Sequence, residues 1–133
     1  MSTGEWRLLQ LEDRPEIVRA AEDVATWGFP RPVVPVEVDL CSWFRMGRGL
    51  VFWFEPPCDL EPGDARMHLA VAPRLHSAWP VRRWDYACQI VAELLGANRI
   101  IFTPCPGDVR TGEYAVRLGW VREGQSYVRA LGG

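Results

Sequence analysis

The fold is decided by residues 67–104, which read MHLAVAPRLHSAWPVRRWDYACQIVAELLGANRIIFTP. Residues 67–73 alternate between two faces, with apolar side chains at 67, 69 and 71 on one of them, as in a strand. Apolar residues then recur at helical spacing from Trp84 to Leu95, and Gly96 follows where a left-handed helix cap is expected. Residues 99–104 form a second apolar strand. Together these segments predict a parallel strand pair joined by a right-handed helical crossover.

The two strands also predict where a ligand would bind. In open α/β sheets, ligands tend to bind beyond the carboxyl ends of the parallel strands. Here those ends lie near Pro73 and Pro104. We therefore expect the functional surface at residues 72–79 and 103–108.

The first third of the chain predicts a strand, a helix and a connector. Residues 6–11 fit an opening strand. Asp13 precedes Pro15 and Glu16, a pattern that starts helices, with the Asp13 side chain accepting a bond from a first-turn amide. An apolar face then runs to Trp27. Gly28 and the prolines at 30, 32 and 35 predict the end of the helix and an extended connector.

The remaining segments complete an α/β pattern. Residues 39–46 fit either a short helix or a strand, 49–54 fit a strand, and 56–64 fit a turn-rich loop. A short helix over 109–118 and a hairpin over 120–131, turning near Gly124, close the chain. We expect one domain over residues 1–133, of the α/β class, with a mixed twisted sheet flanked by helices.

The charged residues exclude several functions. All 15 basic residues are arginine, so no lysine is present to contact a nucleotide phosphate or to form a Schiff base. The 17 acidic residues give a formal net charge of −2, which argues against a nucleic-acid binder.

The cysteines and the apolar runs indicate a reduced, soluble protein. Cys41, Cys58, Cys88 and Cys105 contain no closely spaced pair, which favours reduced thiols and predicts no metal site. Residues 50–54 form the longest apolar run, far short of the ~20 residues that span a bilayer. No signal peptide is visible, so we expect a protein of the cytoplasm, in a host cell, or of a virion, without membrane or nucleic-acid partners.

Residues 114–124, YAVRLGWVREG, carry a resemblance to a known family. A short helix ending in Leu-Gly-aromatic, followed by a strand ending in Glu-Gly, resembles the GNAT superfamily of acyl-CoA N-acyltransferases. The order of elements over residues 64–131 is similar too. The short loop after Pro73, the WPVRR start of the next helix (residues 79–83) and the small size look most like the GNAT-fold proteins of tailed bacteriophages, some of which are virion components.

The resemblance implies acetyl-CoA as cofactor and a set of residues that bind it. The backbone of the strand containing Leu69 and Val71 would pair with the pantetheine arm. The following loop and helix start would receive the pyrophosphate, because a helix N-terminus attracts anions. The residues implied there are Arg74, Ser77, Ala78, Trp79, Arg82 and Arg83.

Three positions depart from the family pattern. The phosphate loop of the family has glycines that let the backbone approach the pyrophosphate, and Ser77 and Trp79 stand in their places here. The tyrosine that acts as the general acid in the family corresponds to Ala115, and Tyr114 is one residue away. An asparagine that is frequent in the family corresponds to Asp108.

Two residues are candidates for accepting the proton of an amine. His68 lies on the face opposite the apolar one, where it is either a base or a hydrogen-bonded structural histidine. Glu55 follows the strand over 49–54, where it is either a base acting through water or a solvated charge. Cys105 has no histidine near it in the sequence and is not expected to be a nucleophile.

Two functions therefore remain open. The first is an acetyl-CoA-dependent N-acetyltransferase acting on a small amine or a protein N-terminus. The second is a non-catalytic structural or adaptor component of a phage virion, built on the same fold and bound to protein partners. Trp43 and Trp79 are the tryptophans that we expect to face such a partner.

Overall fold

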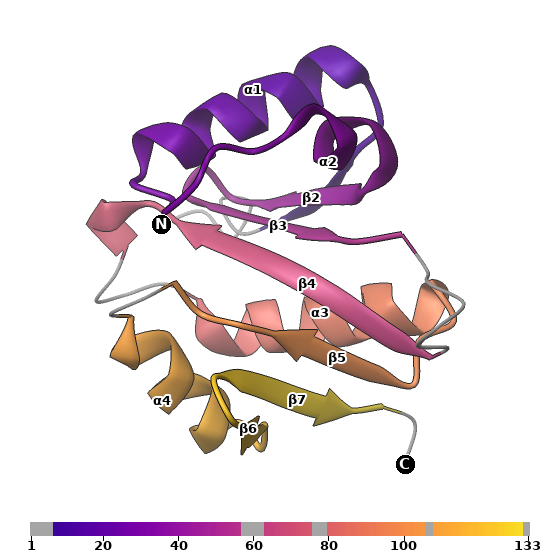
Figure 1. Ribbon diagram of the computed structural model, residues 1–133, viewed down its shortest axis with the longest axis vertical. Coiled ribbons are helices and arrows are strands. Elements are labelled where there is room, and N and C mark those ends of the chain that lie inside the picture. The colour runs from indigo at the N-terminus through magenta and orange to yellow at the C-terminus, as the bar shows by residue number, and fades with distance from the viewer. Residues whose placement is uncertain (1–6, 57–62, 76–79, 106–107, 132–133) are drawn as a thin grey trace.

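The computed structural model describes residues 7–56, 63–75, 80–105 and 108–131. Within these ranges, seven strands form one mixed sheet in the order β1-β2-β3-β4-β5-β7-β6 (Figure 1). The strands are β1 (Leu8–Leu11), β2 (Ser42–Met46), β3 (Leu50–Phe54), β4 (Asp64–Val71), β5 (Arg99–Phe102), β6 (Val121–Glu123) and β7 (Ser126–Ala130). The helices are α1 (Arg14–Thr26), α2 (Pro35–Leu40), α3 (Val81–Leu94) and α4 (Val109–Arg117), with a 3-10 turn, η2 (Pro73–Leu75).

The parallel pair predicted from the sequence is confirmed. β4 and β5 run parallel and are joined through α3, whereas every other neighbouring pair is antiparallel. The register of β4 and β5 begins at Asp64 and Arg99 and ends at Met67 and Phe102. β4 continues to Val71 beyond that point, so the two strands separate at their carboxyl ends.

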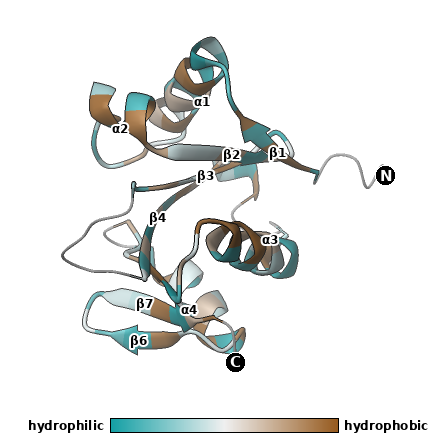
Figure 2. Cartoon of the chain, turned by 90° about the vertical axis from the view of Figure 1, so that its right-hand side faces the viewer, coloured by the Kyte–Doolittle hydropathy of each residue, from teal (hydrophilic) through white to brown (hydrophobic). Residues whose placement is uncertain are grey.

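The sheet carries one apolar core on each face. α1 and α2 cover β2 and β3 on one side, and α3 lies on the other (Figures 1 and 2). Alternation along β4 places Met67 in the α3 core and Ala70 in the α1 core, as the sequence pattern predicted. The helix caps at Gly28 and Gly96 also agree with the sequence, since both have positive φ, of 86° and 79°.

Three expectations for the first half of the chain were wrong. Residues 35–40 form α2, because Pro35 occupies the first helical turn, where proline is tolerated, and does not extend the connector. Asp13 is the N-cap of α1, but its side chain makes no capping hydrogen bond. Trp43 is only 1% exposed and stacks on Trp53 at 4.4 Å, so it belongs to the core and cannot face a partner.

No helix in the described ranges is long and apolar enough to cross a membrane.

Gly112 provides a test of packing between α4 and the sheet. Glycine inside a helix costs about 1 kcal/mol relative to alanine, so Gly112→Ala would ordinarily stabilise the protein. Here a methyl group would overlap the Tyr127 hydroxyl and lie 2.6 Å from Tyr127 Cζ, and stacking on Phe102 holds that ring in place. We expect Gly112→Ala to lower the free energy of unfolding by about 1 kcal/mol or more, measured by urea denaturation.

The matched control is the double variant with Tyr127→Phe, which removes the oxygen nearest the new methyl group. In the Tyr127→Phe background, Gly112→Ala should lower the free energy of unfolding by less than it does in the wild type. A stabilising effect of Gly112→Ala in the wild type would contradict the packing described.

Candidate functional site

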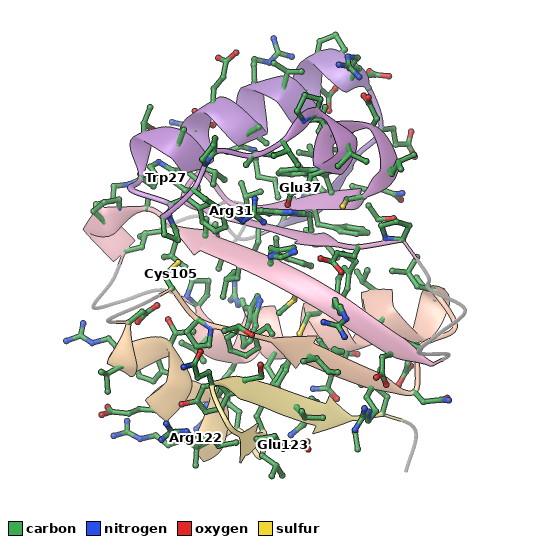
Figure 3. All side chains as sticks on the ribbon, viewed as in Figure 1. Trp27, Arg31, Glu37, Cys105, Arg122 and Glu123 are labelled. Atoms are coloured by element: carbon green, nitrogen blue, oxygen red, sulfur yellow. The ribbon has the colours of Figure 1, made fainter. Side chains whose placement is uncertain are left out.

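A cavity of about 520 Å³ opens where β4 and β5 separate. Its walls come from the end of β4, the segment after β5, the start of α4 and the connector that follows α1. Figure 3 shows two of its lining residues, Trp27 and Cys105, at the same end of the sheet. This is the end predicted from the topology, and the volume is typical of a small-molecule site.

The cavity meets the edge of β4. Leu69, Ala70 and Val71 all line it, although their side chains alternate between the two faces of the sheet. A cavity that touches three consecutive residues of a strand must face the backbone between them. The site therefore offers peptide groups as well as side chains.

Strand pairing fixes which peptide groups point into the cavity. The Arg66 carbonyl accepts a 2.8 Å bond from the Glu55 amide, so even-numbered residues of β4 turn their backbone groups toward β3. Leu69 and Val71 accordingly turn theirs toward the side of β5, where the ladder has ended. An extended, amide-containing ligand could hydrogen-bond to that edge as an added strand does.

The connector after α1 forms an aromatic wall. Trp27 and Phe29 line the cavity, and Phe29 packs on Trp53 with ring centroids 5.3 Å apart. Trp53 in turn stacks on His68 at 5.4 Å. These contacts link the cavity to the face of the sheet that α1 and α2 cover.

An ion pair between the exposed Arg31 and the buried Glu37 anchors this wall. Arg31 donates two hydrogen bonds to the Glu37 carboxylate, of 2.5 and 3.0 Å, and its guanidinium lies over Phe29 (Figure 3). The same carboxylate accepts a 2.8 Å bond from Trp53 Nε1 and a 3.2 Å bond from the Val34 amide. Burial alone would raise the pKa of Glu37, but these bonds outweigh it and lower the pKa to about 2.

The two proton-acceptor candidates lie together. His68 Nε2 is 3.1 Å from Glu55 Oε1, and both side chains are partly exposed on the face that α1 and α2 cover. Neither residue is among those lining the cavity, but His68 precedes the lining residue Ala70 by two positions on the same face, about 7 Å along the strand. The pair therefore stands two residues along β4 from the cavity wall, on the face of Ala70.

The predicted phosphate-binding residues are only partly covered by the structure. Ser77, Ala78 and Trp79 lie outside the described residues. The arginines at 74, 82 and 83 are exposed, the first in η2 and the other two in the first turn of α3.

The start of α4 forms the floor of the cavity. Asp108 caps the helix, accepting a 3.1 Å bond from the Thr111 amide and a 2.6 Å bond from its hydroxyl. Ala115, at the position of the family's tyrosine, is fully buried in the core, whereas Tyr114 is half-buried and does not line the cavity. Among the described residues, the start of α4 therefore lines the cavity with Asp108, Arg110 and Thr111, and the Tyr114 hydroxyl group is not part of the lining.

The Cys105 thiol is not activated. It is half-buried in the cavity wall, and burial together with the Asp108 carboxylate raises its pKa above the ordinary value. The expectation that it is no nucleophile agrees with this.

Sequence reasoning missed the Arg31–Glu37 pair and the aromatic wall. A proline cluster suggested only a connector, and Trp27 was assigned to the helix face. The available signal was Pro35 followed by Glu37, a proline and an acid of the kinds that favour the first turn of a helix.

Comparison with known proteins identifies the fold. No family profile and no curated protein matches the sequence. The GNAT domain of S. lividans PAT superposes with a TM-score of 0.72 at 10% identity, over 95% of this chain and 90% of that one. A candidate phosphinothricin N-acetyltransferase gives 0.74 at 10% identity, over 96% and 100% of the chains. A candidate acetyltransferase of Salmonella typhimurium with its cofactor acetyl-CoA gives 0.71 at 11% identity, over 96% and 95%. The chain therefore has the GNAT fold.

Proposed function

We propose that the protein is an acyl-CoA-dependent N-acyltransferase whose acyl donor, acetyl-CoA, lies in the cavity between β4 and β5. The observation that carries the proposal is the edge of β4, where the pairing of the strands turns the peptide groups of Leu69 toward that cavity. The Salmonella protein of the same fold has acetyl-CoA as its cofactor, which supports the choice of donor.

The described residues offer groups for the pantetheine arm and for the phosphates of such a donor. The Leu69 N–H and C=O would pair with the amides of the pantetheine arm, and the half-buried Val71 side chain would pack against it. Arg74, Arg82 and Arg83 would offer charge to the phosphates, and the amides at the start of α3 would bind the same group. Ser77, Ala78 and Trp79 belong to the same proposed phosphate site.

A bound acyl-CoA would supply an acyl group activated as a thioester. The chain's own part is to hold the amine against that group and to take its proton. In its neutral form, His68 can donate Nε2–H to Glu55, which leaves Nδ1 free to accept the proton through a water. The wall of Trp27 and Phe29 would hold the acceptor, a small amine or a protein N-terminus, and exclude water from the reacting atoms.

Replacement of His68 tests this proton transfer. We expect His68→Gln to lower kcat by about 100-fold at pH 7, because general bases contribute 10²–10⁴-fold, while the affinity for acetyl-CoA stays the same. Glu55→Gln should have a smaller effect, of about tenfold, because it removes only the group that orients His68.

The assay would follow free CoA by chromatography, with panels of primary amines and of peptides with free N-termini. Chromatography is preferred to a thiol reagent because the chain has four cysteines of its own. If some amine supports turnover and both variants retain it, His68 is not the base.

A second function is supported by a specific observation, namely Ala115. An enzyme that protonates its leaving thiolate with a tyrosine cannot do so from a buried alanine. Together with Ser77 and Trp79 at two glycine positions of the family's phosphate loop, this supports the alternative that the protein keeps the fold as an adaptor or structural part of a phage virion. That alternative predicts no affinity for acetyl-CoA.

A further inference from the structure

The outer face of α3 carries an apolar stripe. Tyr86, Ile90 and Leu94 follow one another at intervals of four residues, which places them in one row along a helix. They are 70%, 38% and 82% exposed. Figure 2 shows α3 beside the sheet, with no other described element beyond it.

Charges of opposite sign stand at the two ends of this stripe. At 100° per residue, Arg83 and Glu93 fall on the same outward side of α3 as Tyr86, and all are exposed. The face is basic at its N-terminal end and acidic at its C-terminal end. Arg83 forms no ion pair with any residue that the structure describes.

This face of α3 is complementary in charge to the same face of a second copy whose helix runs in the opposite direction. In a two-fold symmetric contact, residue i of one copy meets residue j of the other, and j meets i. With the axis at the level of residue 88, midway between Tyr86 and Ile90, Tyr86 of each copy packs against Ile90 of the other. The same axis brings Arg83 of each copy to Glu93 of the other, since both lie five residues, or about 7.5 Å, from the centre.

We propose that the protein forms a homodimer through antiparallel packing of α3 against α3 of a second copy. Tyr86 and Ile90 of each copy would leave water, and two Arg83–Glu93 pairs would fix the direction. A single 14-residue helix offers less than the ~800 Å² per partner of a standard interface, so the dimer is weak, with Kd on the order of 100 µM. The proposal does not rest on the proposed function, but Arg83 is assigned there to the phosphates, so the dimer is assigned to the protein without cofactor.

Sedimentation velocity from about 10 µM to about 1 mM protein tests the proposal, in the absence of any cofactor. The average mass of the wild type should rise toward twice the monomer mass across this range. Glu93→Arg should raise the Kd at least about tenfold, because two arginines then oppose one another, and Ile90→Glu should do the same by burying a charge. Val116→Glu on α4, a valine 53% exposed, is the matched control and should leave the Kd unchanged.

The exchange of charges gives the sharpest outcome. Arg83→Glu alone should weaken the dimer, and the double variant Arg83→Glu/Glu93→Arg should restore it. A double variant that stays as weak as the single ones would overturn the antiparallel pairing. A wild type that remains monomeric at about 1 mM would overturn the dimer itself and leave the stripe to a different protein partner. All substituted positions are exposed or nearly so, and urea denaturation of each variant controls for folding.

Discussion

Replacing Glu37 by alanine is expected to lower the free energy of unfolding by about 3 kcal/mol at pH 7. The carboxylate is only 10% exposed and accepts bonds from Arg31, Trp53 and Val34 at once. Its removal leaves the indole N–H of Trp53 buried without its acceptor, and it leaves Arg31 without its ionic partner. Urea denaturation at pH 7 measures the loss.

The effect should depend on pH in a defined direction. Folding lowers the pKa of Glu37 from 4.5 to about 2, so its ionised form stabilises the folded state by about 3 kcal/mol. That contribution is complete above pH 4.5 and is lost as the pH falls from 4.5 toward 2. The difference in stability between wild type and Glu37→Ala should therefore narrow over this interval.

Glu37→Gln is the matched control. Its amide oxygen can still accept the hydrogen bond from Trp53 Nε1, so the free energy of unfolding at pH 7 should fall less than with alanine. Because glutamine does not ionise, the stability of this variant should also lack the change between pH 4.5 and 2 that residue 37 gives the wild type. Equal stability of wild type and Glu37→Ala at pH 7 would mean that the ion pair does not anchor the connector.

Filling the cavity should weaken the binding of acetyl-CoA strongly. Cys105 lies in the cavity wall after β5, half-buried, so a larger side chain at this position enters the cavity rather than the core. We expect Cys105→Trp to weaken binding on the order of a hundredfold, which is about 2.7 kcal/mol. Isothermal titration calorimetry measures the change.

Cys105→Ala is the control at the same position. It removes the thiol but leaves the space open, so its affinity should match that of the wild type. Loss of binding in both variants would assign the effect to the thiol, and equal binding in both would place the ligand elsewhere.

Local sequence patterns predicted the half of the fold that positions the cavity. The alternation along β4, the apolar face of α3 and the glycine after it are local signals, and they specify a parallel pair with few alternatives. The resemblance carried by residues 114–124 led to the same fold as the structural comparisons. The ends of β4 were less well predicted. It begins at Asp64, three residues early, because bonds of 2.8 and 2.9 Å to Arg99 join the starts of both strands.

The acceptor side of the site could not be predicted in the same way. Its wall depends on Glu37 bonding to Arg31 and to Trp53, sixteen residues away, and no local period encodes such a contact. The pairing of His68 with Glu55 also follows from the register of β3 and β4, which the sequence leaves open. Each residue was a candidate on its own, and only the sheet brings them within 3.1 Å.

Calorimetric titration of acetyl-CoA into the wild-type protein tests whether the cavity between β4 and β5 binds this cofactor. We expect binding with a Kd in the micromolar range, through the edge of β4 and the arginines near α3. Absence of heat at about 1 mM acetyl-CoA would contradict it, and the protein would then be an adaptor built on the GNAT fold.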